Sequence, residues 1–302
     1  MRHTFQSFWI GDRISPYEAL CMRSFIDHGH GFALYCYNSR LKVPRGVELR
    51  DASTILPKDQ CFAYSTGFGA GSFSACSNLF RYLLLQRFGG WWVDTDVVCL
   101  THCIPIYYSF FAREDDDFIN GAVLYFEPGD RLIEECLRDA LNLGRNVVWG
   151  QIGPRLITQK VQELNRGWEA QPASTCYPVH WSAALDLVDP RKTAEVASST
   201  ANSMMLHLWN EIFRQAAISK KCLPPRGSYL RMLADRHPVA GWRGLYLLND
   251  GSDVCMPSAL TKVRLPARDR VKCIAGTLLS NRLRPLRTST ASDRHIMQPS
   301  NN

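Results

Sequence analysis

Two aspartates lie two residues apart inside an apolar run, at Asp94-Thr95-Asp96. The residues on either side predict a single strand, Trp91–Leu100, that is buried on both faces. Side chains at positions i and i+2 of a strand point to the same face. Buried carboxylates are unfavourable unless a cation or hydrogen-bond donors satisfy them, and a hard divalent cation that also binds a diphosphate is a natural partner. Two surface aspartates at a strand end are the alternative, which the tripeptide alone leaves open.

Alternating strands and helices surround this tripeptide along the chain. Leu79, Leu83 and their neighbours recur at helical spacing over residues 75–88, and Gly89-Gly90 ends that helix directly before the aspartate strand. Further strands are predicted at 7–11, 32–37 and 120–126, and further helices at 16–28, 131–143, 154–164 and 229–235. This alternation predicts an α/β protein with a central, mostly parallel sheet flanked by helices.

The net charge of +7 lies in the C-terminal part of the chain. Nine Lys and Arg residues and only two Asp residues follow residue 260, so the first 260 residues are neutral overall. A neutral body lacks the basic surface of a nucleic-acid-binding protein, and no nucleic-acid partner is predicted. We expect one domain over residues 1–240 and a basic extension over 241–302 whose end is disordered. The extension either contacts anionic membrane lipids or only adds solubility.

Cysteine usage and the lack of long apolar segments bear on the compartment. The 11 cysteines are scattered without a CxxC pair, which predicts neither a zinc site nor a disulfide framework. No signal peptide and no run of about 20 apolar residues is recognised. We therefore expect a cytoplasmic protein in a reducing compartment, or one peripheral to the membrane through its basic extension.

Several blocks of the sequence follow the order of a known family. The blocks Ser77–Arg81 and Phe88–Asp96 resemble the signature of sugar transferases with the DXD motif, in which Ser-Asp-x-x-Arg, an apolar helix and Gly-Gly precede the two aspartates. Its first strand and later blocks resemble Ser7–Gly11, Asn120–Ala122, Trp149–Pro154 and His207–Asn210. The last two blocks, with Thr158, are similar to the α-1,4-galactosyltransferase (globotriaosylceramide synthase-like) branch. That branch is related to the Och1-like mannosyltransferases and the clostridial glucosylating toxins.

The resemblance, which covers residues 5–237, implies a GT-A-type nucleotide-sugar-binding fold and a metal centre. It implies that Asp94 lies near the ribose and sugar of the donor and that Asp96 is a direct ligand of Mn²⁺ (or Mg²⁺). His207 would approach the same metal from the C-terminal side. A packed histidine beside Leu206 and Leu208 is the alternative.

Further roles follow from the same resemblance. For the donor, Trp9 would stack on the nucleobase, Asn78 and Arg81 would hold sugar hydroxyls or phosphate, and Trp209 and Asn210 would complete a lid over the diphosphate and sugar. As catalytic residues, Asn120 and Gln151 would act near the anomeric carbon and the acceptor. A core tryptophan is the alternative for Trp9, and a solvated surface side chain is the alternative for Arg81.

Three positions carry open questions. Asn78 stands where the family has an aspartate that binds sugar hydroxyls, which puts the donor and full activity in question. Ile152 stands where relatives often have a polar residue. The acidic run Glu114–Asp117 is interpreted as a solvated loop, with a metal site as the alternative.

These residues predict transfer of a hexose from a nucleotide-sugar donor, by resemblance a UDP-sugar, to a hydroxyl of a glycan or a lipid-linked acceptor. The resemblance implies metal dependence and retention of anomeric configuration, with the departing phosphate assisting attack. A degenerate nucleotide-sugar- or glycan-binding protein without turnover is the alternative, motivated by Asn78. A metal-dependent phosphoesterase is disfavoured because the carboxylates are too few for a two-metal site.

Overall fold

The computed structural model describes residues 2–67 and 69–244. The basic extension expected over 241–302 therefore lies outside the described residues, apart from its first four. That expectation stays a prediction, as does the division of the chain at residue 240.

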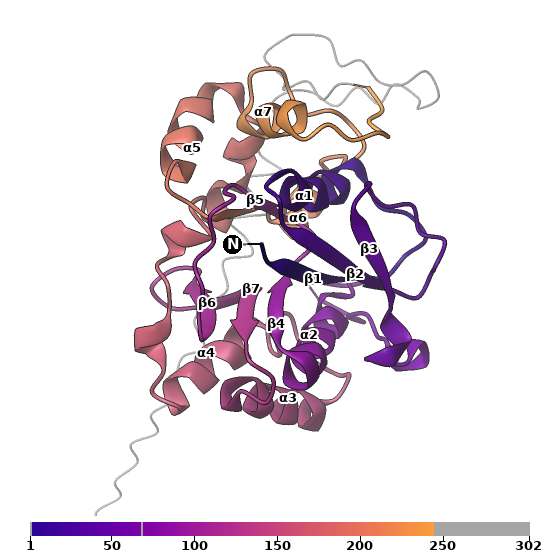
Figure 1. Cartoon of the computed structure of the whole chain (residues 1–302), viewed down its shortest axis with the longest axis vertical. Helices are drawn as coiled ribbons and strands as arrows, with labels where there is room; N and C mark the ends of the chain where they lie inside the picture. Colours follow the sequence, from indigo (N-terminus) through magenta and orange to yellow (C-terminus); the bar gives the residue numbers. More distant parts are fainter. Residues whose placement is uncertain (1, 68, 245–302) are drawn as a thin grey trace, which may run out of the picture. The chain divides into compact units, whose positions relative to one another are not determined.

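A six-stranded sheet lies at the centre of the described residues (Figure 1). Its strand order is β3-β2-β1-β4-β7-β6. The strands are β1 (Thr4–Trp9), β2 (Gly31–Cys36), β3 (Val47–Asp51), β4 (Gly90–Val93), β6 (Ser109–Arg113) and β7 (Ile119–Phe126). β1 pairs in parallel with β2 and β4, and β2 with β3, whereas β7 is antiparallel to both of its neighbours. The predicted α/β class, with a mostly parallel central sheet, is confirmed, and its GT-A type stays a prediction.

Helices cover both faces of this sheet (Figure 1). One face packs against α2 (Ser74–Phe88), α3 (Arg131–Leu143) and α4 (Pro154–Glu163), and the other against α1 (Pro16–Asp27). The adjacent residues Trp91 and Trp92 of β4 point into opposite cores because side chains alternate along a strand. Phe8 of β1 stacks on Phe80 of α2 with ring centroids 3.9 Å apart. The predicted helices over 16–28, 75–88, 131–143 and 154–164 are therefore confirmed to within about two residues.

The C-terminal half of the described chain adds a third apolar core beside α1. This half of the chain contains α5 (Thr193–Thr200), α6 (Asn210–Gln215) and α7 (Tyr229–Arg236), together with several 3₁₀ turns. A two-stranded sheet of β5 (Val97–Cys99) and β8 (Met205–His207) joins this part to the centre. No helix in residues 2–67 and 69–244 has both the length and the apolar character needed to cross a bilayer.

The prediction of one continuous strand over Trp91–Leu100 is wrong. β4 ends at Val93, and the chain turns through Asp94-Thr95-Asp96, where the Val97 N–H donates to the Asp94 carbonyl at 3.1 Å. β5 then leaves the central sheet and pairs antiparallel with β8. The polar tripeptide therefore lies in a turn and not in a strand that would bury it on both faces. This turn places both carboxylates at the end of β4.

Candidate functional site

Three side chains from distant parts of the sequence meet at the turn after β4. One ligand atom each of Asp94, Asp96 and His207 can be chosen so that all three lie within 4.8 Å of one another. The pairing of β5 with β8 causes this, because it sets His207 directly opposite Val97, the residue after Asp96. The structure thus brings together all three predicted metal ligands, and His207 faces carboxylates instead of packing among Leu206 and Leu208.

Asp96 is held by the segment that follows β8. Its Oδ2 accepts the Asn210 N–H at 2.9 Å and lies 3.2 Å from Nε2 of His207, while its carbonyl accepts the Leu208 N–H at 2.9 Å. Burial alone raises the pKa of a carboxyl, but the charge and hydrogen bond of His207, with the Asn210 N–H, lower the pKa of Asp96 to about 2. Asp96 is therefore an anion at neutral pH.

The chain bends sharply at Trp209, and this bend brings the His207 ring and the Asn210 N–H to the carboxylate of Asp96. Trp209 adopts a left-handed backbone conformation, φ 57° and ψ 52°, which costs a non-glycine residue about 1–2 kcal/mol. Its indole N–H donates to the Val179 carbonyl at 2.8 Å, and its ring centroid lies 4.1 Å from that of His207. Trp209 therefore packs beside the His207 ring, and its proposed part in a lid stays a prediction.

Arg81, which lies on α2, binds the other aspartate, Asp94. Its Nη2 donates to Asp94 Oδ1 at 2.7 Å, and its Nη1 donates to the Gly121 carbonyl. The Trp92 indole N–H donates to the same Asp94 oxygen at 2.8 Å, and the guanidinium lies 5.2 Å from the centroid of the Trp92 ring. Arg81 is only 4% exposed, so it is not a solvated surface side chain. Among the described residues both donors take Oδ1, which leaves Asp94 Oδ2 available to a cation.

Gly121 leaves the space that Arg81 needs. A Cβ built there would lie 2.3 Å from Nη1 of Arg81, well inside van der Waals contact. We expect Gly121→Ala to push the guanidinium away from Asp94 and to lower the free energy of unfolding by about 1–3 kcal/mol. Thermal unfolding and the KM for the donor would both report this change. Gly167→Ala is the matched control, since its Cβ would meet nothing closer than 4.0 Å. Equal effects of the two substitutions would contradict the assignment.

Asn120 is held next to this centre by a carboxylate that the sequence interpretation missed. The Asn120 Oδ1 accepts the Ala122 N–H at 2.7 Å, and its Nδ2 donates to Glu114 Oε2 at 2.6 Å. Burial is the main reason that the pKa of Glu114 is raised, although the Asn120 amide opposes the shift. The expectation of a wholly solvated loop at Glu114–Asp117 is therefore wrong at Glu114, but it holds for Asp116 and Asp117, which are exposed.

The register of the β6–β7 hairpin is the signal that could have predicted the contact between Glu114 and Asn120. Ala112 pairs with Asn120 across β6 and β7, and Glu114 lies two residues beyond Ala112. Side chains two apart on a strand share a face, so Glu114 reaches Asn120 diagonally. Glu114, Asp115 and His180 also have ligand atoms within 4.8 Å of one another, in a second and more open group.

The remaining predicted site residues lie around the centre without joining its hydrogen bonds. Trp9 ends β1, and its buried indole N–H has no partner among the described residues. Asn78 is buried on α2 against Gly153, where an added Cβ would lie 2.8 Å from its Nδ2. Gln151 accepts the Val148 N–H at 3.0 Å within its own loop. Their donor and catalytic roles stay predictions, as does the lid role of Asn210.

Asp94, Asp96 and His207 fit a divalent cation. Two carboxylates and one imidazole nitrogen form a donor set that suits Mn²⁺, and also Mg²⁺ when phosphate oxygens and waters complete the shell. His207 Nδ1 is buried without a partner among the described residues, so the ring is held by its Nε2 contact and by aromatic neighbours. The donor set does not separate the two metals.

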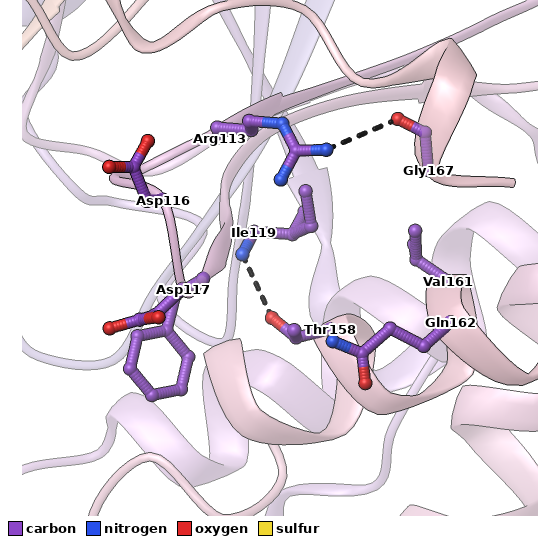
Figure 2. A pocket seen from close by; sticks show the side chains of 9 residues that line it. Arg113, Asp116, Asp117, Ile119, Thr158, Val161, Gln162 and Gly167 are labelled. Atoms are coloured by element: carbon purple, nitrogen blue, oxygen red, sulfur yellow. Dashed lines mark hydrogen bonds between the residues drawn. The ribbon is translucent and has the colours of Figure 1, made fainter.

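A small pocket of about 110 Å³ lies elsewhere, between the hairpin loop and α4 (Figure 2). Two of its polar groups are already used, because Arg113 donates to the Gly167 carbonyl at 3.4 Å and the Ile119 N–H donates to Thr158 Oγ1 at 2.8 Å. Neither aspartate of the tripeptide nor His207 lines it. The candidate site is therefore the Asp94–Asp96–His207 centre and not this pocket.

The second half of the described chain is similar to known proteins. The family described as alpha 1,4-glycosyltransferase conserved region matches residues 125–237, which carry α3, α4, β8 and the corner at Trp209. Residues 125–237 are thus similar to those of a glycosyltransferase family. The matched residues supply His207 and Asn210, whereas both aspartates come from outside the match.

Curated proteins that are similar to this chain carry glycosyltransferase names. The lactosylceramide 4-alpha-galactosyltransferase of Rattus norvegicus is 28% identical over 149 residues, which are 45% of this chain and 40% of the relative. The Homo sapiens protein of that name is 26% identical over 45% of this chain and 41% of its own. Homo sapiens alpha-1,4-N-acetylglucosaminyltransferase is 23% identical over 152 residues, 45% of this chain and 42% of its own. The chain thus spans about two fifths of the length of these relatives.

Solved structures with some likeness to this chain also include glycosyltransferases. The PaToxG glycosyltransferase has a TM-score of 0.42 and 11% identity over 55% of this chain and 70% of its own. The apo-form glycosyltransferase GlyE of Streptococcus pneumoniae has the same TM-score and identity over 80% of this chain and 61% of its own.

Proposed function

We propose that this protein is a glycosyltransferase that moves a hexose from a nucleotide-sugar donor, with UDP as the nucleotide, to a hydroxyl of a glycan or glycolipid. The observation that carries the proposal is the convergence of Asp94, Asp96 and His207 at the turn after β4, with Arg81 bound to Asp94. The names of the relatives support a galactose or N-acetylglucosamine donor, and one of them supports a lactosylceramide-like acceptor.

The residues of the site divide the work of such a transfer. A bound Mn²⁺ would neutralise the diphosphate and stabilise charge on the departing nucleotide. Asp94, Asp96 and His207 would hold that cation, and the buried Arg81 keeps Asp94 fixed in the geometry the site needs. Trp9, at the carboxyl end of β1, would stack on the base.

Asn120 and Glu114 form the acceptor-side wall in this proposal. The Asn120 amide is fixed at both ends, so it presents a defined donor and acceptor to sugar hydroxyls. We propose retention of configuration, in which the departing phosphate removes the proton of the incoming hydroxyl. Neither Asn120 nor Gln151 is then required to act as a nucleophile.

The Asp96–His207 pair predicts a pH dependence of opposite sign for folding and for metal binding. The pKa of Asp96 falls from 3.8 to about 2, so its stabilisation is present above pH 3.8 and is lost as pH falls toward 2. Burial lowers the pKa of His207, but Asp96 more than reverses this and raises it above 6.5. Its stabilisation is present below pH 6.5 and is lost as pH rises through the raised pKa.

In EDTA, the melting temperature of the wild type should therefore exceed that of His207→Gln most between about pH 4 and 6.5. Mn²⁺ binds only the neutral imidazole, so metal affinity should instead rise with pH above 6.5. Thermal unfolding with and without Mn²⁺ across this range checks both signs. Mn²⁺ affinity that is flat from pH 6 to 8.5 would show that His207 is not a ligand.

A screen of nucleotide sugars for slow Mn²⁺-dependent hydrolysis tests the function. Release of UDP from one donor, abolished by EDTA, supports a transferase. Tight UDP binding without hydrolysis of any donor, even with mixed glycan acceptors, supports the alternative of a binding protein, which the presence of Asn78 motivates.

We also propose that the protein acts in the cytoplasm, with its basic extension touching anionic lipids near a lipid-linked acceptor. The extension lies outside the described residues. Sedimentation with anionic liposomes, for the full chain and for a chain ending at Thr261, tests this proposal. Equal sedimentation would assign the extension a solubilising role.

A further inference from the structure

Glu18 is a buried carboxylate that the proposed chemistry does not use. It lies in the first turn of α1 and is 0% exposed. Four donors reach its two oxygens: Oε2 accepts the Ser15 N–H at 3.1 Å and the Ser15 hydroxyl, while Oε1 accepts from Asn210 Nδ2 at 3.2 Å and from the Lys220 ammonium. A cationic partner and this many hydrogen-bond donors offset the cost of burying a carboxylate.

Asn210 connects this carboxylate to the metal centre. The side chain of Asn210 binds Glu18, whereas its backbone N–H binds Oδ2 of Asp96 at 2.9 Å. Asn210 also begins α6 directly after the left-handed Trp209. The orientation of its peptide, and with it the direction of the Asp96 carboxylate, therefore depends on how the Asn210 side chain is anchored.

Lys220 completes the chain of contacts from the other end of α6. It follows the helix by five residues, and its ammonium is bound to Glu18. The Glu18–Lys220 pair thus ties the first turn of α1 to both sides of α6.

We propose that Glu18 and Lys220 are positioning residues for the metal centre: they clamp α6 so that the Asn210 N–H fixes one oxygen of Asp96 and leaves the other to the cation. This inference rests on the proposed metal-dependent function. A role limited to capping α1 would predict lower stability for variants but unchanged metal affinity.

Mn²⁺ binding to the full chain, followed by the loss of the free-ion signal in electron paramagnetic resonance, separates these two roles. We expect Glu18→Gln and Lys220→Met each to weaken Mn²⁺ binding by about 10-fold or more, as substitutions behind metal ligands commonly do. Excess Mn²⁺ should restore donor hydrolysis. Ser15→Ala removes one hydroxyl donor only, so it should fold even if the other variants do not and should weaken binding by a smaller factor.

Lys160→Met is the matched control. Like the part-exposed Lys220, the buried Lys160 pairs with carboxylates: Asp139 at 2.6 Å and Glu163 at 2.7 Å, between α3 and α4 on the other side of the sheet. It should lower the melting temperature in EDTA while leaving Mn²⁺ affinity unchanged.

The outcomes are distinct. Wild-type affinity in folded Glu18→Gln and Lys220→Met overturns the positioning role and leaves the proposed function intact. Absence of Mn²⁺ binding by the wild type overturns the metal centre itself, and this inference with it.

Discussion

Asp96→Asn is expected to reduce Mn²⁺-dependent donor hydrolysis by at least about 10³-fold, which corresponds to about 4 kcal/mol of lost transition-state stabilisation. Asparagine has the shape of aspartate and can still accept the Asn210 N–H, so the corner at Trp209 should persist. It loses the negative charge that would bind the cation and that pairs with His207. Initial rates over a range of Mn²⁺ concentrations measure the effect, and circular dichroism confirms folding.

Asp116→Asn is the appropriate control, because Asp116 is exposed in the hairpin loop. It removes the same charge and should leave the rate within twofold. Undiminished Mn²⁺-dependent activity in Asp96→Asn would exclude Asp96 as the metal ligand.

Arg81→Met is expected to lower both stability and activity. Methionine fills part of the volume of the side chain but leaves Asp94 and the Gly121 carbonyl without their cationic partner. Breaking a buried ion pair from one side costs about 3 kcal/mol, which corresponds to a fall of about 6–12 °C in melting temperature for a domain of this size. Donor hydrolysis should fall further than stability accounts for, since Asp94 is then free to rotate.

Arg87→Met tests whether the effect belongs to the site. Arg87 lies on the same helix but is exposed, and it donates only to the Thr54 carbonyl at 3.1 Å. It should cost less than about 0.5 kcal/mol and leave the rate unchanged. A similar loss in both variants would assign Arg81 a purely structural role.

Apolar periodicity predicted the central elements because their burial is regular. The helix before the aspartates and the helix over 131–143 repeat apolar residues at helical spacing, and Gly89 and Gly144 end them with positive φ. β3, β6 and β8 were not predicted, since β3 is a half-exposed edge strand, β8 has three residues and β6 precedes a polar loop. Short strands owe their structure to a distant partner and carry little local signal.

The proposed metal ligands were predicted from family resemblance, whereas the contacts that hold them in place were not. Asp96 and His207 meet because β5 leaves the central sheet, a change that the apolar run Trp91–Leu100 conceals. Glu114 is one residue of an acidic run, which gives no sign that it is held by Asn120. From the sequence, Glu18 is predicted only to lie in the first turn of a helix. Burial of a charged group depends on segments up to 202 residues away, as for Lys220 and Glu18, so no local pattern could indicate it.

The pairing of β5 with β8 also sets an order of events during synthesis. A nascent chain that has emerged as far as residue 200 already carries all six strands of the central sheet, both aspartates and Arg81. It still lacks His207 and the Asn210 N–H, which lies 114 residues beyond Asp96. Contacts over such separations form late because closing the intervening loop is entropically unfavourable. The ribosome-bound chain therefore folds its central sheet before these two groups of the proposed metal centre are present.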